Sequence, residues 1–209
     1  MLTIPLGPER AEIVVVNSRF IASLECVESV PEARVFISRI SSEFPDATHN
    51  VPAFIIGGGN ATTDFCSDDG EPSGTSGRPL LTVLKGSGLA NVAVVVTRYF
   101  GGTLLGTGGL VKAYTAAGKA VLARTKRAAL VELARIELDL PYALLERERI
   151  VAVEAGATVV EESFAETVRT VVDVPTDTLD RFSSRLAELS SGGVKPKRLE
   201  TRIGRRPLL

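Results

Sequence analysis

The chain has 209 residues, of which 44% are hydrophobic and 23% are charged, and its formal net charge is -1. This length can bury a substantial core, and the composition is that of a folded globular protein. The charge balance excludes a polycation that binds nucleic acid by charge alone, the short apolar runs exclude a membrane span, and two cysteines exclude a disulfide framework.

The first residues carry no basic segment ahead of a long apolar stretch. We therefore expect no secretory signal. The corresponding expectations are a cytoplasmic location and no membrane partner.

Residues 1–127 predict an α+β domain in which strands and helices alternate. The first two strands are expected to pair as antiparallel neighbours that meet near Asn17 and Ser18. The predicted elements are, in chain order, two strands within 12–27, a helix over 31–44, a strand over 51–58, a helix over 77–88, a strand over 91–100 and a helix over 104–125. The residues expected to form apolar faces are Val35, Ile37, Ile40 and Phe44 on the first helix, and Leu110, Tyr114, Ala117 and Val121 on the last.

Residues 128–209 predict a second domain, because most of the 19 glycines come earlier and the later sequence consists of regular elements with short joints. The predicted elements are a strand over 129–140, a helix over 141–156, two strands within 157–175, a helix over 176–193 and a strand over 194–201. This order is the split βαβ, or ferredoxin-like, arrangement.

The sequence contains no complete nucleotide or calcium motif. The glycine clusters lack the last glycine of a dinucleotide fingerprint, Gly118-Lys119 lacks the rest of a P-loop, and the acids do not alternate as in an EF-hand. A nucleophilic pair of Cys66 with the single histidine, His49, would require the two to meet in the fold. We expect both to have structural roles and assign no catalytic residue.

The stretch SDDGEPSGTSGRP, residues 67–79, places Asp68, Asp69 and Glu71 within four positions, and Thr75 follows. Neighbouring carboxylates could act as an acid and a base if burial separated their pKa values, and Asp68 and Asp69 could hold Mg²⁺ through bound waters. The alternative is a turn with solvated carboxylates.

A second motif, TRYFGGTLLGTGGLVKAY, spans residues 97–114. A buried strand delivers an arginine, two glycines permit a sharp turn, and further glycines open a helix whose free N–H groups favour an anion. The alternative is that the glycines serve close backbone packing alone. The residues of this motif that could form a site are Arg98, Gly101, Gly102, Gly106, Gly108, Gly109, Lys112 and Tyr114.

Basic residues collect after Val194, where Glu200 is the single acid. A basic end on an acidic body could contact phosphates, or it could be a solvated end. The candidate nucleic-acid contacts are Lys195, Lys197, Arg198, Arg202, Arg205 and Arg206.

Together, the segments SRFIA, PDATHN, DDGEPSGTSGRPLL and VVTRYFGGTLLGTGGLVKAY resemble the IMPACT family, in particular its bacterial YigZ branch. The resemblance covers nearly the whole chain. It implies an N-terminal domain with the ribosomal-protein second-domain-like fold and a C-terminal ferredoxin-like domain similar to a late domain of elongation factor G.

The resemblance also carries functional expectations. Eukaryotic relatives act on translation control by competing for an activator of the kinase that senses amino-acid starvation, partly through an extra N-terminal domain. This sequence starts directly at the family domain, so we do not expect that kinase role. For bacterial members the family implies no settled activity, and Asn17 stands where lysine is usual, which removes one phosphate contact.

Two functional hypotheses follow, and a third possibility is an interaction module whose acidic loop docks a basic partner. The first is a non-catalytic, translation-associated regulatory factor that binds RNA, the ribosome or a translation protein. The second is an enzyme or small-molecule binder that recognises a phosphorylated or nucleotide ligand at the acidic loop and the glycine-rich helix start. No cofactor is expected beyond Mg²⁺ at the two aspartates. The candidate ligand-binding residues are Arg19, His49, Asp68, Asp69, Glu71 and Thr75, with Arg98, Gly101, Gly102, Gly106, Gly108, Gly109, Lys112 and Tyr114 of the second motif.

Overall fold

The computed structural model describes residues 2–58 and 61–208 and divides into two compact units. The N-terminal unit comprises residues 2–129 together with the end of the chain from Pro207, and the C-terminal unit comprises residues 130–206. Both units combine helices with a sheet. The predicted two-domain α+β fold is therefore confirmed.

The N-terminal unit is built on an antiparallel sheet with strand order β2-β3-β6-β4-β5. Its strands are β2 (Glu9–Val15), β3 (Ser18–Cys26), β4 (His49–Gly58), β5 (Ala61–Cys66) and β6 (Val92–Tyr99). The central strand β6 is buried along nearly its whole length, as its valine-rich sequence predicts. In its register, Arg98 lies opposite both Phe20 of β3 and His49 of β4.

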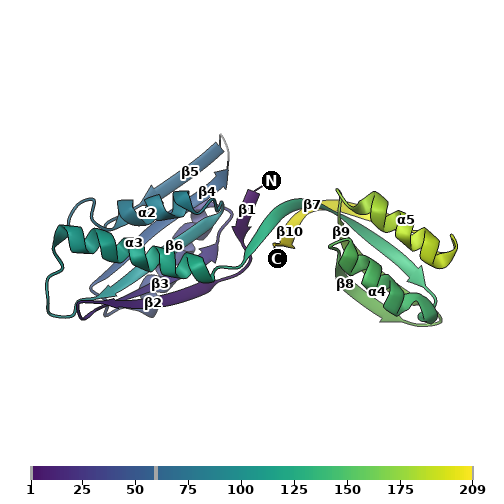
Figure 1. Cartoon of the computed structure of the whole chain (residues 1–209), viewed down its shortest axis with the longest axis horizontal. Helices are drawn as coiled ribbons and strands as arrows, with labels where there is room; N and C mark the ends of the chain where they lie inside the picture. The colour runs from purple at the N-terminus through teal and green to yellow at the C-terminus, as the bar shows by residue number, and fades with distance from the viewer. Residues whose placement is uncertain (1, 59–60, 209) are drawn as a thin grey trace. The chain divides into compact units, whose positions relative to one another are not determined.

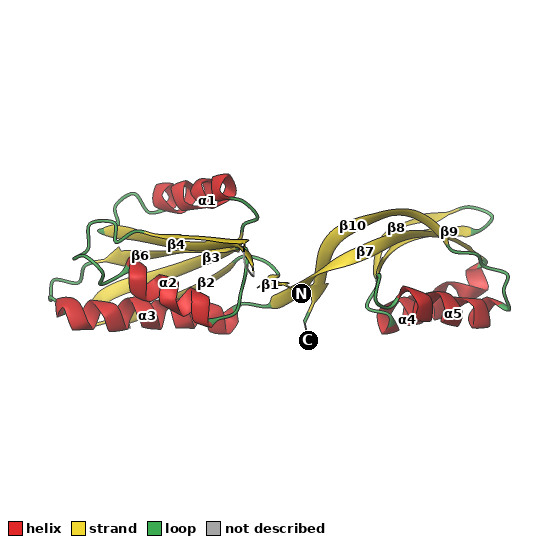
Figure 2. Cartoon of the chain, turned by 90° about the horizontal axis from the view of Figure 1, so that it is seen from above, coloured by secondary structure: helices red, strands yellow, loops and turns green. Residues whose placement is uncertain are grey.

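Helices cover both faces of this sheet, as Figure 2 shows. Helix α1 (Val30–Glu43) lies on one face, and helices α2 (Gly77–Gly86) and α3 (Gly106–Arg124) lie on the other. The predicted apolar face of α3 is buried in the core. Among the described residues, no helix combines the length and apolar character needed to cross a bilayer.

Three predictions for this unit were wrong. Strand β1 (Leu2–Pro5) was not expected, because its four residues give too short a pattern. Edge strand β5 was missed because its residues are polar and mostly exposed. On α1, Ile40 is buried and Ile37 and Phe44 pack against the core as predicted, but Val35 is 68% exposed and its neighbour Phe36 is buried instead.

The C-terminal unit has the predicted order of elements (Figure 1). Its elements are β7 (Arg127–Leu140), the short 3-10 helix Tyr142–Leu144, α4 (Leu145–Glu154), β8 (Thr158–Phe164), β9 (Val168–Pro175), α5 (Leu179–Ser190) and β10 (Lys197–Pro207). The spatial order β10-β7-β9-β8 places the fourth strand beside the first, as in the ferredoxin-like arrangement. Strand β10 runs beyond its predicted end at residue 201.

The core of the C-terminal unit contains a carboxyl group without a partner. Glu148 of α4 is fully buried, and neither carboxyl oxygen has a hydrogen-bond partner among the described residues. Burial, with a smaller contribution from the Glu162 carboxylate, raises the pKa of Glu148 to about 7. This group therefore links the stability of the unit to pH.

Candidate functional site

A buried ion pair joins the two sequence motifs. Strand β6 delivers Arg98, and the acidic loop after β5 delivers Glu71. Arg98 Nη1 lies 2.7 Å from Glu71 Oε1 and 2.9 Å from Oε2, and their side chains are only 6% and 2% exposed. Inside the protein, where water is excluded, each of the two charges is stabilised by the opposite charge of its partner.

Three further side chains complete the network around Glu71. Tyr114 of α3 donates its hydroxyl to Glu71 Oε1 at 2.7 Å, and burial followed by this contact raises the pKa of Tyr114. His49 donates from Nδ1 to the carbonyl of Asp69 at 2.6 Å, which leaves its Nε2 3.8 Å from Glu71 Oε2. On the other side, Arg98 Nη2 contacts the Ser18 hydroxyl at 3.4 Å.

Asp68 and Asp69 hold the acidic loop together. Asp68 accepts hydrogen bonds from the backbone N–H groups of Gly74, Ser76 and Gly77 and from the Ser76 hydroxyl. Burial alone would raise the pKa of Asp68, but these donors outweigh it and lower the pKa below its ordinary value. Asp69 accepts from the backbone N–H of Asn50 at 2.6 Å.

The glycine turn also packs closely against the turn between β2 and β3. A Cβ atom on Gly101 would lie 2.1 Å from the carbonyl carbon of Asn17, and the Gly101 N–H donates to the Ser18 hydroxyl. Only glycine permits this approach. The packing interpretation of the motif therefore holds for this residue.

The two motifs meet at one pocket of about 380 Å³. Its lining is mainly apolar, and Phe100 and Leu104 are exposed there. The start of α3 at Gly106 and Thr107 closes one side. The Arg98 Nε is buried without an acceptor among the described residues, so a bound partner or solvent could satisfy it.

The chemistry of this site is that of a structural network. The carboxylates of Asp68, Asp69 and Glu71 all accept internal hydrogen bonds, including those of the two aspartates considered for Mg²⁺. Within the described residues, no group of three metal-ligating side chains gathers. Burial raises the pKa of the Cys66 thiol, which disfavours the nucleophilic thiolate.

The other predicted site residues lie around this network. Thr75 is buried and donates its hydroxyl to the Pro72 carbonyl. Arg19 of β3 pairs with Glu12 of β2, and both side chains are exposed. Lys112 is exposed on α3, after the remaining motif glycines, Gly102, Gly108 and Gly109, of which Gly102 has a positive φ of 82°.

The basic residues near the C-terminus mostly belong to strand β10. Lys197 pairs with Glu137, Arg202 pairs with Asp173, and Arg206 pairs with Asp177. Arg198 donates to a neighbouring threonine, Arg205 also has an interaction, and Lys195 precedes the strand and is exposed. Much of this charge is therefore compensated within the C-terminal unit.

Sequence reasoning missed three residues of the site. Ser18 bridges the Arg98 guanidinium and the glycine turn, and Phe100 and Leu104 form the apolar rim of the pocket. Each lies inside or beside a quoted motif, so the signal was present. Their roles depend on contacts across the sheet that spacing along the chain does not reveal.

Two family models match this chain. The model described as Impact N-terminal domain matches residues 16–122, and that of a domain of unknown function, DUF1949, matches residues 138–192. An IMPACT family member from Haemophilus influenzae is 36% identical over 185 residues, which are 88% of this chain and 90% of that protein.

Two further comparisons cover almost the whole chain. The IMPACT family member YigZ from Escherichia coli is 33% identical over 193 residues, 92% of this chain and 95% of that protein. A crystal structure described as that of a hypothetical protein aligns with a TM-score of 0.59 at 33% identity, covering 95% of this chain and 97% of that chain. Both halves of the fold are thus shared with these relatives.

Proposed function

The chain belongs to the IMPACT family, and from this premise we propose that it is a non-catalytic regulatory factor of translation that binds the ribosome or a translation protein. The proposed role in translation rests on the eukaryotic members of the family, which act on translation control. We propose that the residues of this site do not catalyse a reaction.

The observation that carries the proposal is the use of the motif carboxylates inside the protein. Glu71 is paired with Arg98, and Asp68 accepts hydrogen bonds from its own loop, so both carboxylates are already engaged within the protein. The Arg98 charge is neutralised by Glu71 and is therefore not available to a phosphate. What the network presents outward is an apolar pocket rimmed by Phe100 and Leu104. An exposed aromatic side chain beside an apolar pocket is typical of a protein-binding surface.

The charges also favour a protein partner over RNA at this pocket. Arg98 is neutralised by Glu71, and His49 is engaged with a backbone carbonyl. RNA contacts would need uncompensated lysines or arginines near the surface. An RNA contact through β10 would have to displace the pairs with Glu137, Asp173 and Asp177.

Leu104→Asp is expected to weaken binding to ribosomes by about tenfold or more, because it places a charge on the apolar rim of the pocket. Leu104 is 86% exposed, so its substitution should leave the fold intact. The measurement is co-sedimentation of the purified chain with ribosomes washed at low salt, which retain bound translation factors.

The matched control is Val35→Asp, which also replaces an exposed aliphatic side chain by aspartate but lies on α1, on the other face of the sheet from α2 and α3. It should change binding by less than about twofold. Equal binding by Leu104→Asp and wild type would remove the pocket from the proposal. Stabilisation of the chain by nucleotides or phosphate, in place of ribosome binding, would favour the small-molecule hypothesis.

A further inference from the structure

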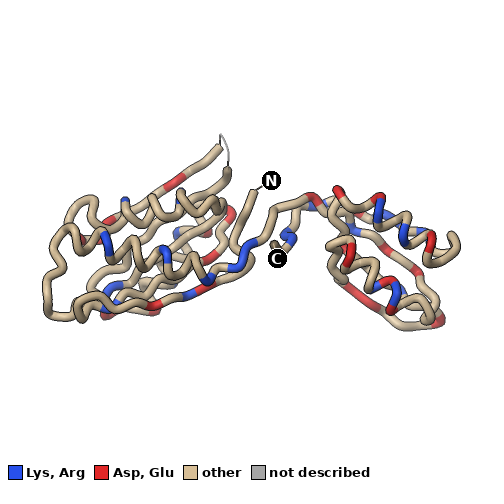
Figure 3. The backbone as a smooth tube through the Cα atoms, in the orientation of Figure 1, with Lys and Arg blue, Asp and Glu red and all other residues tan. Residues whose placement is uncertain are grey.

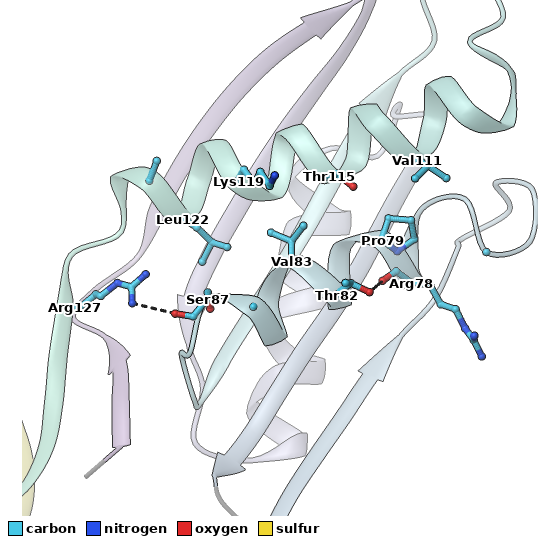
Figure 4. Close-up of a pocket in the computed structure, with 13 residues that line it drawn as sticks. Arg78, Pro79, Thr82, Val83, Ser87, Val111, Thr115, Lys119, Leu122 and Arg127 are labelled. Carbon is cyan, nitrogen blue, oxygen red and sulfur yellow. Dashed lines mark hydrogen bonds between the residues drawn. The ribbon is translucent and has the colours of Figure 1, made fainter.

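A second surface lies between helices α2 and α3 and shares no lining residue with the motif pocket. It is a groove of about 830 Å³ whose lining includes Val83 of α2 and Val111 and Leu122 of α3. Figure 4 shows side chains of both helices facing one another across it. The groove residues of α3 recur at Val111, Thr115, Lys119 and Leu122, the spacing of one helix face.

The two helices approach closely along this groove. A Cβ atom on Gly118 of α3 would lie 2.9 Å from Leu80 Cδ1 and 3.4 Å from Val83 Cγ1 of α2. The missing side chain therefore lets α2 lie directly against α3. This contact fixes the spacing of the two ridges that border the groove.

All charged residues that line the groove are basic: Arg78, Lys119 and Arg127. Arg78 and Arg127 lie toward opposite ends, and Lys119 lies on α3 between them (Figure 4). Helices α2 and α3 contain no aspartate or glutamate, and Figure 3 shows their basic positions without acidic ones.

In the part of the chain that the structure describes, no carboxylate forms an ion pair with Arg78, Lys119 or Arg127. Arg127 Nη1 donates to the Ser87 carbonyl at 3.0 Å (Figure 4), so its charge is hydrogen-bonded but not neutralised. By contrast, Lys85 and Arg124 of the same helices pair with Asp64 and Glu9. Basic side chains without carboxylate partners beside apolar lining residues favour a ligand that has an apolar face flanked by acidic groups.

We propose that this groove binds an acidic amphipathic helix of a partner protein. A partner helix that lies along the groove, over the contact of α2 with α3, would place apolar side chains on Val83, Val111 and Leu122. Those side chains would be spaced by three or four residues. Its flanking carboxylates would meet Arg78, Lys119 and Arg127. RNA fits less well, because no aromatic side chain lines the groove to stack a base.

The test is selection from a phage library of helix-constrained peptides on the full-length chain, followed by fluorescence polarisation with the enriched peptides. Enriched sequences are expected to carry apolar residues at helical spacing with Asp or Glu beside them. Lys119→Glu should weaken their binding by about tenfold or more, because attraction becomes repulsion at an exposed position that folding does not use.

The control is Arg34→Glu, which makes the same charge change at an exposed position of α1 on the other face of the sheet. It should change peptide affinity by less than about twofold. Failure to enrich acidic peptides, or equal binding to Lys119→Glu, would overturn the inference. A labelled single-stranded RNA that binds wild type and Arg34→Glu but not Lys119→Glu would assign the groove to RNA instead. Leu104→Asp lies in the motif pocket and should leave peptide binding to the groove intact even where it abolishes ribosome binding. That result would show that the groove binds its ligand independently of the proposed translation function.

Discussion

Glu71→Ala should lower the free energy of unfolding of the N-terminal unit by about 3–5 kcal/mol, because it leaves the buried Arg98 guanidinium without a counter-charge. Tyr114 would lose its hydroxyl acceptor at the same time. The acidic loop would also be released from β6. Amide exchange in Val92–Tyr99, compared between wild type and variant, measures the loss.

Two further variants make the interpretation specific. Glu188→Ala removes the partner of Arg185, but both side chains are more than half exposed, so the expected cost is below about 1 kcal/mol. Replacing both partners, as Glu71→Leu with Arg98→Met, should cost less than Glu71→Ala alone, because no unpaired charge remains. A cost for Glu71→Ala as small as that of Glu188→Ala would show that the pair does not hold the motifs together.

Glu148→Gln should stabilise the C-terminal unit by about 3 kcal/mol near pH 8 and by about 1 kcal/mol or less near pH 5. The pKa of Glu148 rises from its ordinary value of 4.5 to about 7 in the folded chain. The Glu148 carboxyl group therefore binds its proton more tightly in the folded state than in the unfolded state. The corresponding stability is fully present below the unfolded pKa and is lost as pH rises through the folded pKa.

The measurement is amide exchange in Val168–Pro175 at both pH values, corrected for the intrinsic exchange rate. Glu146→Gln is the control, because Glu146 lies on the same helix with a side chain that is 79% exposed. It should change stability by less than about 0.5 kcal/mol at either pH. An effect of Glu148→Gln that is the same at both pH values would contradict a titrating buried carboxyl.

The fold could largely be predicted from the chain, because its elements have strong local patterns. Strand β6 begins with the valine-rich, buried run Val92–Val96, and α3 carries Leu110, Tyr114, Ala117 and Val121 on one face. Strand β5 could not be predicted, since an exposed edge strand needs no apolar alternation. On α1, Val35 was assigned to the buried face in place of Phe36, because the two are neighbours and periodicity alone could not choose between them.

Both motifs were predicted to contribute to one surface, but the way in which their side chains pair was not predicted. The carboxylates of the acidic loop and the arginine of the glycine motif were both identified as candidates, but their pairing depends on tertiary contact between residues 27 positions apart. The role expected of Arg98, a phosphate contact, needs a free charge, and Glu71 neutralises it. The groove between α2 and α3 was not predicted, because it depends on which faces of two helices meet around Gly118.

The central claim is that the two motifs build a binding face rather than a reaction centre. Its most direct test is the hydrogen-exchange footprint of the full-length chain with and without ribosomes washed at low salt. We predict protection of peptides that contain Phe100–Leu105 and Thr48–Asn50, and no protection of Lys197–Pro207. Protection confined to Lys197–Pro207 that disappears with added salt would contradict this account, as would the absence of protection at Phe100–Leu105.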